Sequence, residues 1–142
     1  DEGRAGLACF APTSSSLVAG GANAMLYLWD LSSEVMGRVA EMPPSVNSVV
    51  AVEALHKTDE VAVLGDDGTL LILSFTLAGC EVVLEIGGPS ASVIKSFDFG
   101  PHDKYLASVT AAGTMDFHDL AAARRNALEL GGARQLSRPS SL

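Results

Sequence analysis

The chain has 142 residues, a length typical of one compact domain, and 48% of them are hydrophobic, which excludes a disordered chain. Its 9 basic and 17 acidic residues give a formal net charge of −8, which argues against nucleic acid because phosphate binding depends on Lys and Arg. Cys9 and Cys80 form no disulfide framework, so we expect free thiols in a reducing, cytoplasmic compartment. No apolar run reaches the roughly 18 residues that span a bilayer.

The first part of the chain predicts four short strands. An apolar run at 7–10 precedes a hairpin whose strands, 17–20 and 25–29, flank a turn that contains Asn23. A fourth strand is expected at 35–42, where Pro43 and Pro44 end it because proline lacks a ladder N–H.

The same order of elements follows twice more. The second unit has strands at 48–55, 61–65, 69–75 and 81–86, with Asp66, Asp67 and Gly68 in its hairpin turn. The third has strands at 93–99, 106–110 and 114–120, with Gly113 in the turn. Both faces of the strand at 48–55 are apolar, as expected for a strand covered on two sides.

Beyond Leu120 the local signals conflict. Residues 121–130 are rich in Ala, Leu and Arg and favour a helix on propensity alone. The repeat register instead places an outer strand at 127–130, and we favour that strand because packing can override propensity. Residues 133–142 are expected to form a linker or a frayed tail.

The spacing makes these units a repeat. Trp29 precedes Leu73 by 44 residues, and Leu73 precedes His118 by 45. A period of about 40–45 residues with four strands per unit is typical of propeller blades. The sequence therefore predicts an all-β fold of three four-stranded antiparallel blades, at 1–43, 44–88 and 89–132.

The segment from Leu26 to Asp30, Leu-Tyr-Leu-Trp-Asp, resembles the Trp-Asp (WD40) repeat family. In that family a turn Asp, a second-strand Ser or Thr and the Trp share a hydrogen-bonded network. The resemblance assigns the turn position to Asn23, Asp67 and Ala112, the second-strand position to Ala19, Val63 and Ser108, and the Trp position to Trp29, Leu73 and His118. No unit has the complete set, so apolar packing must hold the blades together.

The order of segments over residues 7–120 is also similar to the later repeats of TBC-domain-containing WD-repeat proteins of centriolar satellites and ciliary bases. Its markers are Leu-Trp-Asp, Met-Pro, Asp-Gly, Glu-Ile-Gly and Pro-His-x-Lys-Tyr-Leu-Ala-Ser. The resemblance implies a parent with a Rab GTPase-activating TBC domain and coiled coils, at the centrosome or cilium. No catalytic residue carries over, because none of those segments is in this chain.

A search for catalytic chemistry finds no constellation. His118 beside Asp116 supplies too few ligands for a metal site, and His56 and His102 fall in polar turns. The Gly-Gly pairs start no phosphate-binding loop, and the Ser run at 14–16 lacks a nucleophile frame. Glu41, Glu85 and Glu129 recur at a spacing of 44 residues. We interpret them as solvent-facing residues of the outer strands, and a cation-binding rim is the alternative. We expect no catalytic residue, metal or cofactor.

The sequence therefore favours a non-enzymatic module that binds a protein or peptide through loops at one end of the blades. The candidate docking residues lie in two hairpin turns and two connections between blades: Asn23, Pro43, Pro44, Asn47, Asp66, Asp67, Ser90 and Ser92. The alternative is a propeller hydrolase or metal-dependent enzyme whose central channel would have to use Asn47, Lys95 and Asp98.

Three blades would leave two apolar flanks, which carry Leu7, Cys9, Val93 and their neighbours, and large apolar patches are rare on soluble monomers. The chain opens on a strand without an initiating Met, which we interpret as a piece of a longer protein. We expect it to pack against further blades of its own parent, in a ring that in this family closes with about six to eight blades.

Overall fold

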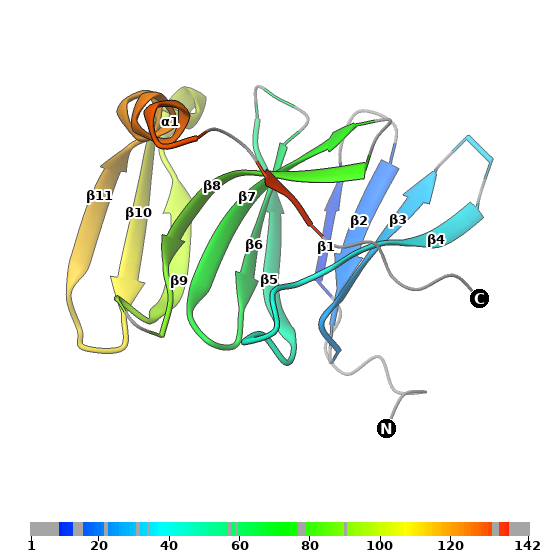
Figure 1. Ribbon diagram of the computed structural model, residues 1–142, viewed down its shortest axis with the longest axis horizontal. Coiled ribbons are helices and arrows are strands. Elements are labelled where there is room, and N and C mark those ends of the chain that lie inside the picture. Colours follow the sequence, from blue (N-terminus) through cyan, green and yellow to red (C-terminus); the bar gives the residue numbers. More distant parts are fainter. Residues whose placement is uncertain are drawn as a thin grey trace.

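A computed structural model describes residues 9–12, 16–21, 23–30, 32–33, 35–56, 58, 60–76, 79–89, 91–131 and 134–136. These residues form three antiparallel sheets, arranged one beside the next like blades that do not close into a ring, one α-helix, and one short 3-10 helix at Pro101–Asp103 (Figure 1). The expected all-β arrangement of antiparallel blades is confirmed. No described helix is long and apolar enough to cross a membrane.

Each sheet follows chain order. The first contains β1 (Cys9–Pro12), β2 (Ser16–Gly20), β3 (Met25–Asp30) and β4 (Val35–Glu41). The second contains β5 (Val49–Ala54), β6 (Glu60–Gly65), β7 (Thr69–Thr76) and β8 (Gly79–Gly87), and β12 (Arg134–Gln135) joins its edge. The third contains β9 (Ile94–Phe99), β10 (Tyr105–Thr110) and β11 (Met115–Asp119). The expected strands up to residue 120 are present, although residues 7 and 8 of the first lie outside the described residues.

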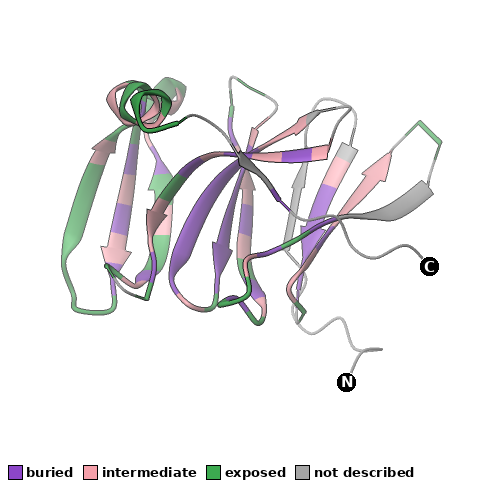
Figure 2. Cartoon of the chain, in the orientation of Figure 1, coloured by how far each residue is buried: buried purple, intermediate pink, exposed green. Residues whose placement is uncertain are grey.

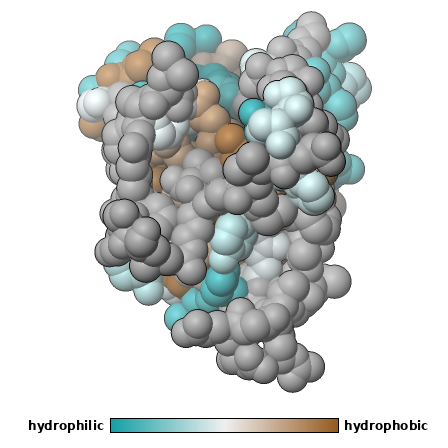
Figure 3. All heavy atoms as spheres, turned by 90° about the vertical axis from the view of Figure 1, so that its right-hand side faces the viewer, coloured by the Kyte–Doolittle hydropathy of each residue, from teal (hydrophilic) through white to brown (hydrophobic). Residues whose placement is uncertain are grey.

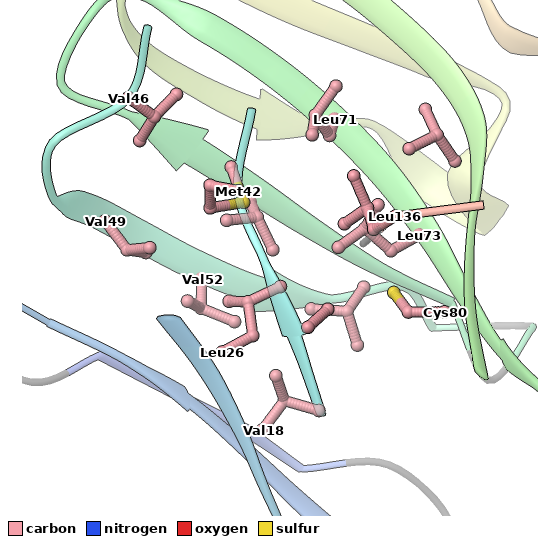
Figure 4. Packing of buried hydrophobic residues seen from close by; sticks show 14 residues of the cluster. Val18, Leu26, Met42, Val46, Val49, Val52, Leu71, Leu73, Cys80 and Leu136 are labelled. Carbon is pink, nitrogen blue, oxygen red and sulfur yellow. The ribbon is translucent and has the colours of Figure 1, made fainter. Parts of the chain in front are cut away.

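The second sheet is the centre of the molecule because both of its faces are apolar. Side chains alternate across a strand, so odd-numbered and even-numbered residues of β6 and β7 face opposite ways. Val61, Val63, Leu71 and Leu73 join one buried cluster with Val18 and Leu26 of the first sheet (Figure 4). Figure 2 shows the resulting burial of the second sheet.

The even-numbered residues form the second interface. Ala62, Leu64, Leu70 and Ile72 pack in a separate cluster with residues of the third sheet, including Ile94, Phe99 and Leu106. The successive residues from Leu70 to Leu73 are all 0% exposed. A continuous apolar strand is therefore buried between two neighbouring sheets. In β5, for which the sequence predicts covered faces, Val50 is 45% exposed. Seen from the side of the first sheet, hydrophobic residues are visible at the upper left and upper middle, and hydrophilic ones mainly at the top and right (Figure 3).

The prediction of an outer strand at 127–130 is wrong, because Leu120–Glu129 form the helix α1. Asp119 caps its start and accepts a hydrogen bond from the N–H of Ala122 at 3.1 Å. Gly131, with φ +123°, follows its end. Helix propensity prevails over the repeat register here because the helix has both a cap and a buried contact through Leu120.

Two consequences follow for the third unit and for the tail. The third sheet has three described strands where four were expected, since the chain turns into α1 after β11. Arg134–Gln135, expected in a linker or frayed tail, form a strand paired antiparallel with Val82 and Glu81 of β8. Leu136, which is buried, donates its N–H to the carbonyl oxygen of Cys80.

Candidate functional site

The predicted docking residues that the structure describes lie in loops at one end of the sheets, along the lower edge of Figure 1. Backbone hydrogen bonds connect each hairpin turn to the start of the next sheet. The N–H of Val49 donates to the oxygen of Gly21 at 2.8 Å, and that of Ile94 donates to the oxygen of Gly68 at 3.0 Å. The turns and connections that the sequence assigned to one end thus lie together, and we call this surface the loop end.

Asp66 and Asp67 hold the loop end together. Asp66 accepts a hydrogen bond from the backbone N–H of Asn47 at 2.9 Å. Asp67 accepts bonds from the hydroxyl of Ser45 at 2.6 Å, the hydroxyl of Thr69 at 2.9 Å and the N–H of Thr69 at 2.9 Å. Both carboxylates therefore fix the connection between the first two sheets, a role that the sequence analysis missed.

The pKa of Asp67 is lowered by this arrangement. Partial burial acts to raise it, because a charged group loses hydration, but hydrogen bonds from Ser45 and Thr69 stabilise the carboxylate and outweigh that effect. Asp67 is thus an ionised structural group at neutral pH, and of this pair only Asp66 is exposed.

The remaining candidates are mostly accessible. Asn23 is exposed, donates to the hydroxyl of Tyr27 at 3.0 Å and accepts from the N–H of Met25. Pro43 is half-buried. Pro44 and Asn47, in the same connection, are exposed, and so is Ser92 in the connection between the second and third sheets. Ser90 lies outside the described residues.

The assigned Trp positions show one partial network. In the third sheet the Ser108 hydroxyl and His118 Nε2 are 3.3 Å apart, and Ser108 is 1% exposed. In the first sheet Ala19 stands where the third sheet has Ser108. Among the described residues, nothing accepts a hydrogen bond from the buried Nε1 of Trp29. His118 thus fills the Trp position as expected.

The described part of the chain contains no group of three or more His, Cys, Asp or Glu residues that could hold a metal ion. Cys80 is buried, and burial raises the pKa of its thiol to about 12, so it stays protonated and unreactive. The channel candidates Asn47, Lys95 and Asp98 are exposed, as are Glu41, Glu85 and Glu129. Nothing in this arrangement supports the hydrolase alternative.

Polar pairs join the second and third sheets at the end opposite the loop end. His56 Nδ1 lies 2.9 Å from Asp103 Oδ1, and Arg124 of α1 makes two hydrogen bonds, of 2.8 and 2.6 Å, with Glu60. Beside them lies a cavity of about 460 Å³ lined by Leu55, His102, Lys104, Arg124 and others. The sequence does not predict these pairs, because Arg124 was not expected in a helix and His56 was expected in a polar turn.

Among the described residues, one face of the third sheet is exposed at Met115 and Phe117 and half-buried at Ala107 and Val109. Ile72 of the second sheet is 0% exposed because the third sheet covers it, whereas Phe117, 45 residues later at the equivalent position, is 71% exposed. Met115, equivalent to the fully buried Leu70, is 60% exposed. The apolar pattern that buries a face between the second and third sheets recurs on the third sheet without a cover, as Figure 2 shows for β11.

No family model matches this chain. It is similar to TBC1 domain family member 31 from Xenopus laevis, with 30% identity over 112 residues, which cover 75% of this chain and 10% of that protein. The protein of that name from Homo sapiens is 28% identical over 112 residues, and that from Mus musculus 30% over 116. The chain spans about a tenth of the length of the curated relatives it matches.

Among solved structures, the computationally designed Ika4 protein aligns with a TM-score of 0.48 and 15% identity. The alignment covers 83% of this chain and 94% of that one.

Proposed function

We propose that this chain is a non-catalytic part of a propeller scaffold in a larger TBC-domain protein, and that its loop end docks a protein or peptide. The observation that carries the propeller part of the proposal is the contrast in side-chain exposure between Ile72 and Phe117. The same register position is fully buried in the second sheet and 71% exposed in the third.

A further sheet accounts for this contrast. The outward face of the third sheet carries Ala107, Val109, Met115 and Phe117, which match Ala62, Leu64, Leu70 and Ile72 at an offset of 45 residues. An exposed apolar face of this kind marks an interface, since soluble monomers rarely leave one open. The similarity to TBC1 domain family member 31 supports a parent that continues beyond this chain.

The loop end suits docking because its shape is fixed while its side chains stay accessible. Hydrogen bonds to Asp66 and Asp67 hold the connection from Ser45 to Asn47, so little conformational entropy is lost on binding. Exposed Pro44, Asn47 and Ser92 offer apolar and hydrogen-bonding contacts. Functional residues often lie on loops held by a rigid sheet scaffold, which supports a docking role for this end.

The experiment uses substitutions that leave the loop hydrogen bonds in place. Asp66→Asn removes the charge but keeps an oxygen that can accept the Asn47 N–H. Combined with Pro44→Ala, Asn47→Ala and Ser92→Ala in the parent protein, it should abolish binding of partners recovered with the native protein. The control, His102→Ala, changes an exposed residue at the opposite end and should leave binding intact. Retention of every partner by the combined variant would refute docking at the loop end.

The resemblance to centriolar-satellite and ciliary-base proteins extends the proposal to location. A fluorescently tagged parent protein should concentrate at these structures, and a uniform cytoplasmic signal would refute this part.

A further inference from the structure

We propose that β11 accepts a fourth strand from a separate polypeptide, as an extended segment in which apolar and basic residues alternate. The strand would pair antiparallel with β11 and lie in the groove between β11, β8 and α1. This site is separate from the loop end.

The third sheet is short by one strand. The first two sheets each have four strands in chain order, and every strand pair described is antiparallel. After β11 the chain enters α1 and returns to the edge of β8 as β12, so within the described residues no strand pairs with the outer edge of β11. The addition of β12 to β8 shows that edges in this chain accept a short antiparallel strand.

The backbone of β11 is oriented for such pairing. The N–H of Thr110 donates to the oxygen of Thr114, and that of Leu120 donates to the oxygen of Lys104. Hydrogen-bonded pairs in an antiparallel ladder recur every second residue, so the even-numbered residues of β11 bond to β10. The backbone groups of Met115, Phe117 and Asp119 therefore point toward the open edge.

A groove of about 500 Å³ lies beside this edge. Its walls come from β8, from α1 and from His118 of β11, and its lining is largely apolar: Val82, Val83, Leu84, Ile86, Ala123, Ala127 and Leu130, with Glu85 and Asn126 as polar members. Apolar side chains at alternate positions of an added strand would be buried there.

Charge selects a basic strand. Side chains of the added strand that do not enter the groove would lie on the odd-numbered face of β11, where Asp119 is exposed. A second copy of this chain is disfavoured because each copy carries a formal net charge of −8. Lys or Arg at the positions that point away from the groove would be attracted by Asp119 and by the net negative charge of the chain, whereas acidic residues would be repelled.

The probe is a fluorescein-labelled peptide of about nine alternating Lys and Val residues, long enough to span one strand. It should bind the chain saturably in fluorescence anisotropy and slow hydrogen exchange at Met115, Phe117 and Asp119. A matched Glu-Val peptide, and a Lys-Val peptide N-methylated on alternate residues, should bind at least tenfold more weakly. Equal binding of any control peptide, self-association through β11 instead, or no saturable binding would overturn the proposal.

Two variants separate backbone pairing from side-chain contact. Phe117→Pro removes the edge-facing N–H without removing a donor to β10, and should reduce binding by at least tenfold. Phe117→Ala keeps that N–H and should retain most of the affinity. Circular dichroism establishes that each variant folds, and the N-methylated peptide tests the pairing on the native chain if the proline variant does not. Equal affinity of a folded proline variant and the native chain would also overturn the proposal.

Discussion

Gly68 lies against the start of the third sheet so closely that a Cβ added to it would meet Cα of Val93 at 2.6 Å. Its φ of +87° is a conformation that residues with a side chain rarely adopt. Gly113, at the equivalent position of the third sheet, has φ +86°, and nothing described lies within 4 Å of such a Cβ. The two glycines share their backbone strain but differ in whether another sheet packs on them.

This pair predicts a difference between two alanine variants. Gly113→Ala should reduce the free energy of unfolding by about 1–2 kcal/mol, the cost of a left-handed backbone. Gly68→Ala should lose a further 1–3 kcal/mol or so, because the backbone of Val93 cannot move aside without shifting the third sheet. Urea denaturation of both variants measures the difference, and equal losses would show that the contact between the sheets is loose.

Restoring an acceptor for Trp29 should stabilise the first sheet. Ala19→Ser places a hydroxyl where the third sheet has Ser108, and a bond from Trp29 Nε1 should raise the free energy of unfolding by about 1 kcal/mol. In a Trp29→Phe background the same substitution should give no gain, because the donor is gone. A gain of equal size in both backgrounds would contradict the assignment of these positions.

The half-buried Glu53 predicts a pH dependence. Burial raises the pKa of its carboxyl, and the charge of Asp98 raises it further. Because the folded-state pKa lies above the unfolded value, this group's contribution to stability is largest at low pH and declines as pH rises through the two values. Glu53→Gln should therefore raise Tm at pH 7 and have no such effect below about pH 4. Exposed Glu41→Gln is the control, and a pH-independent difference for Glu53→Gln would contradict the prediction.

The ion pair between Arg124 and Glu60 should anchor α1 to the second sheet. Arg124→Met leaves the carboxylate of Glu60, whose side chain is 13% exposed, without its partner, and should lower the free energy of unfolding by about 1–3 kcal/mol. The double variant with Glu60→Met should recover part of that loss, because no buried charge remains. A double-mutant cycle in urea measures the coupling, and additive losses would show that the pair contributes nothing.

The strands could be predicted because their signals are local. Successive apolar residues in β6 and β7 make both faces of these strands apolar. Gly68 and Gly113 mark turns that require positive φ. The helix was missed because the repeat register was given more weight than Asp119 as a cap and the alanines behind it. The pairs His56–Asp103 and Arg124–Glu60 join residues 47 and 64 positions apart, and no sequence pattern indicates such contacts.

The most direct test of the account is whether a further sheet covers the third sheet in the parent protein. Phe117→Cys, in a background with Cys9 and Cys80 replaced by Ala, should react rapidly with a maleimide in the isolated chain. In the full-length parent the same thiol should react at least an order of magnitude more slowly, because the added sheet buries it as the third sheet buries Ile72. The control Leu130→Cys, at a position 88% exposed, should react equally fast in both. Equal reactivity of the Phe117→Cys thiol in the isolated chain and in the full-length parent would contradict the account.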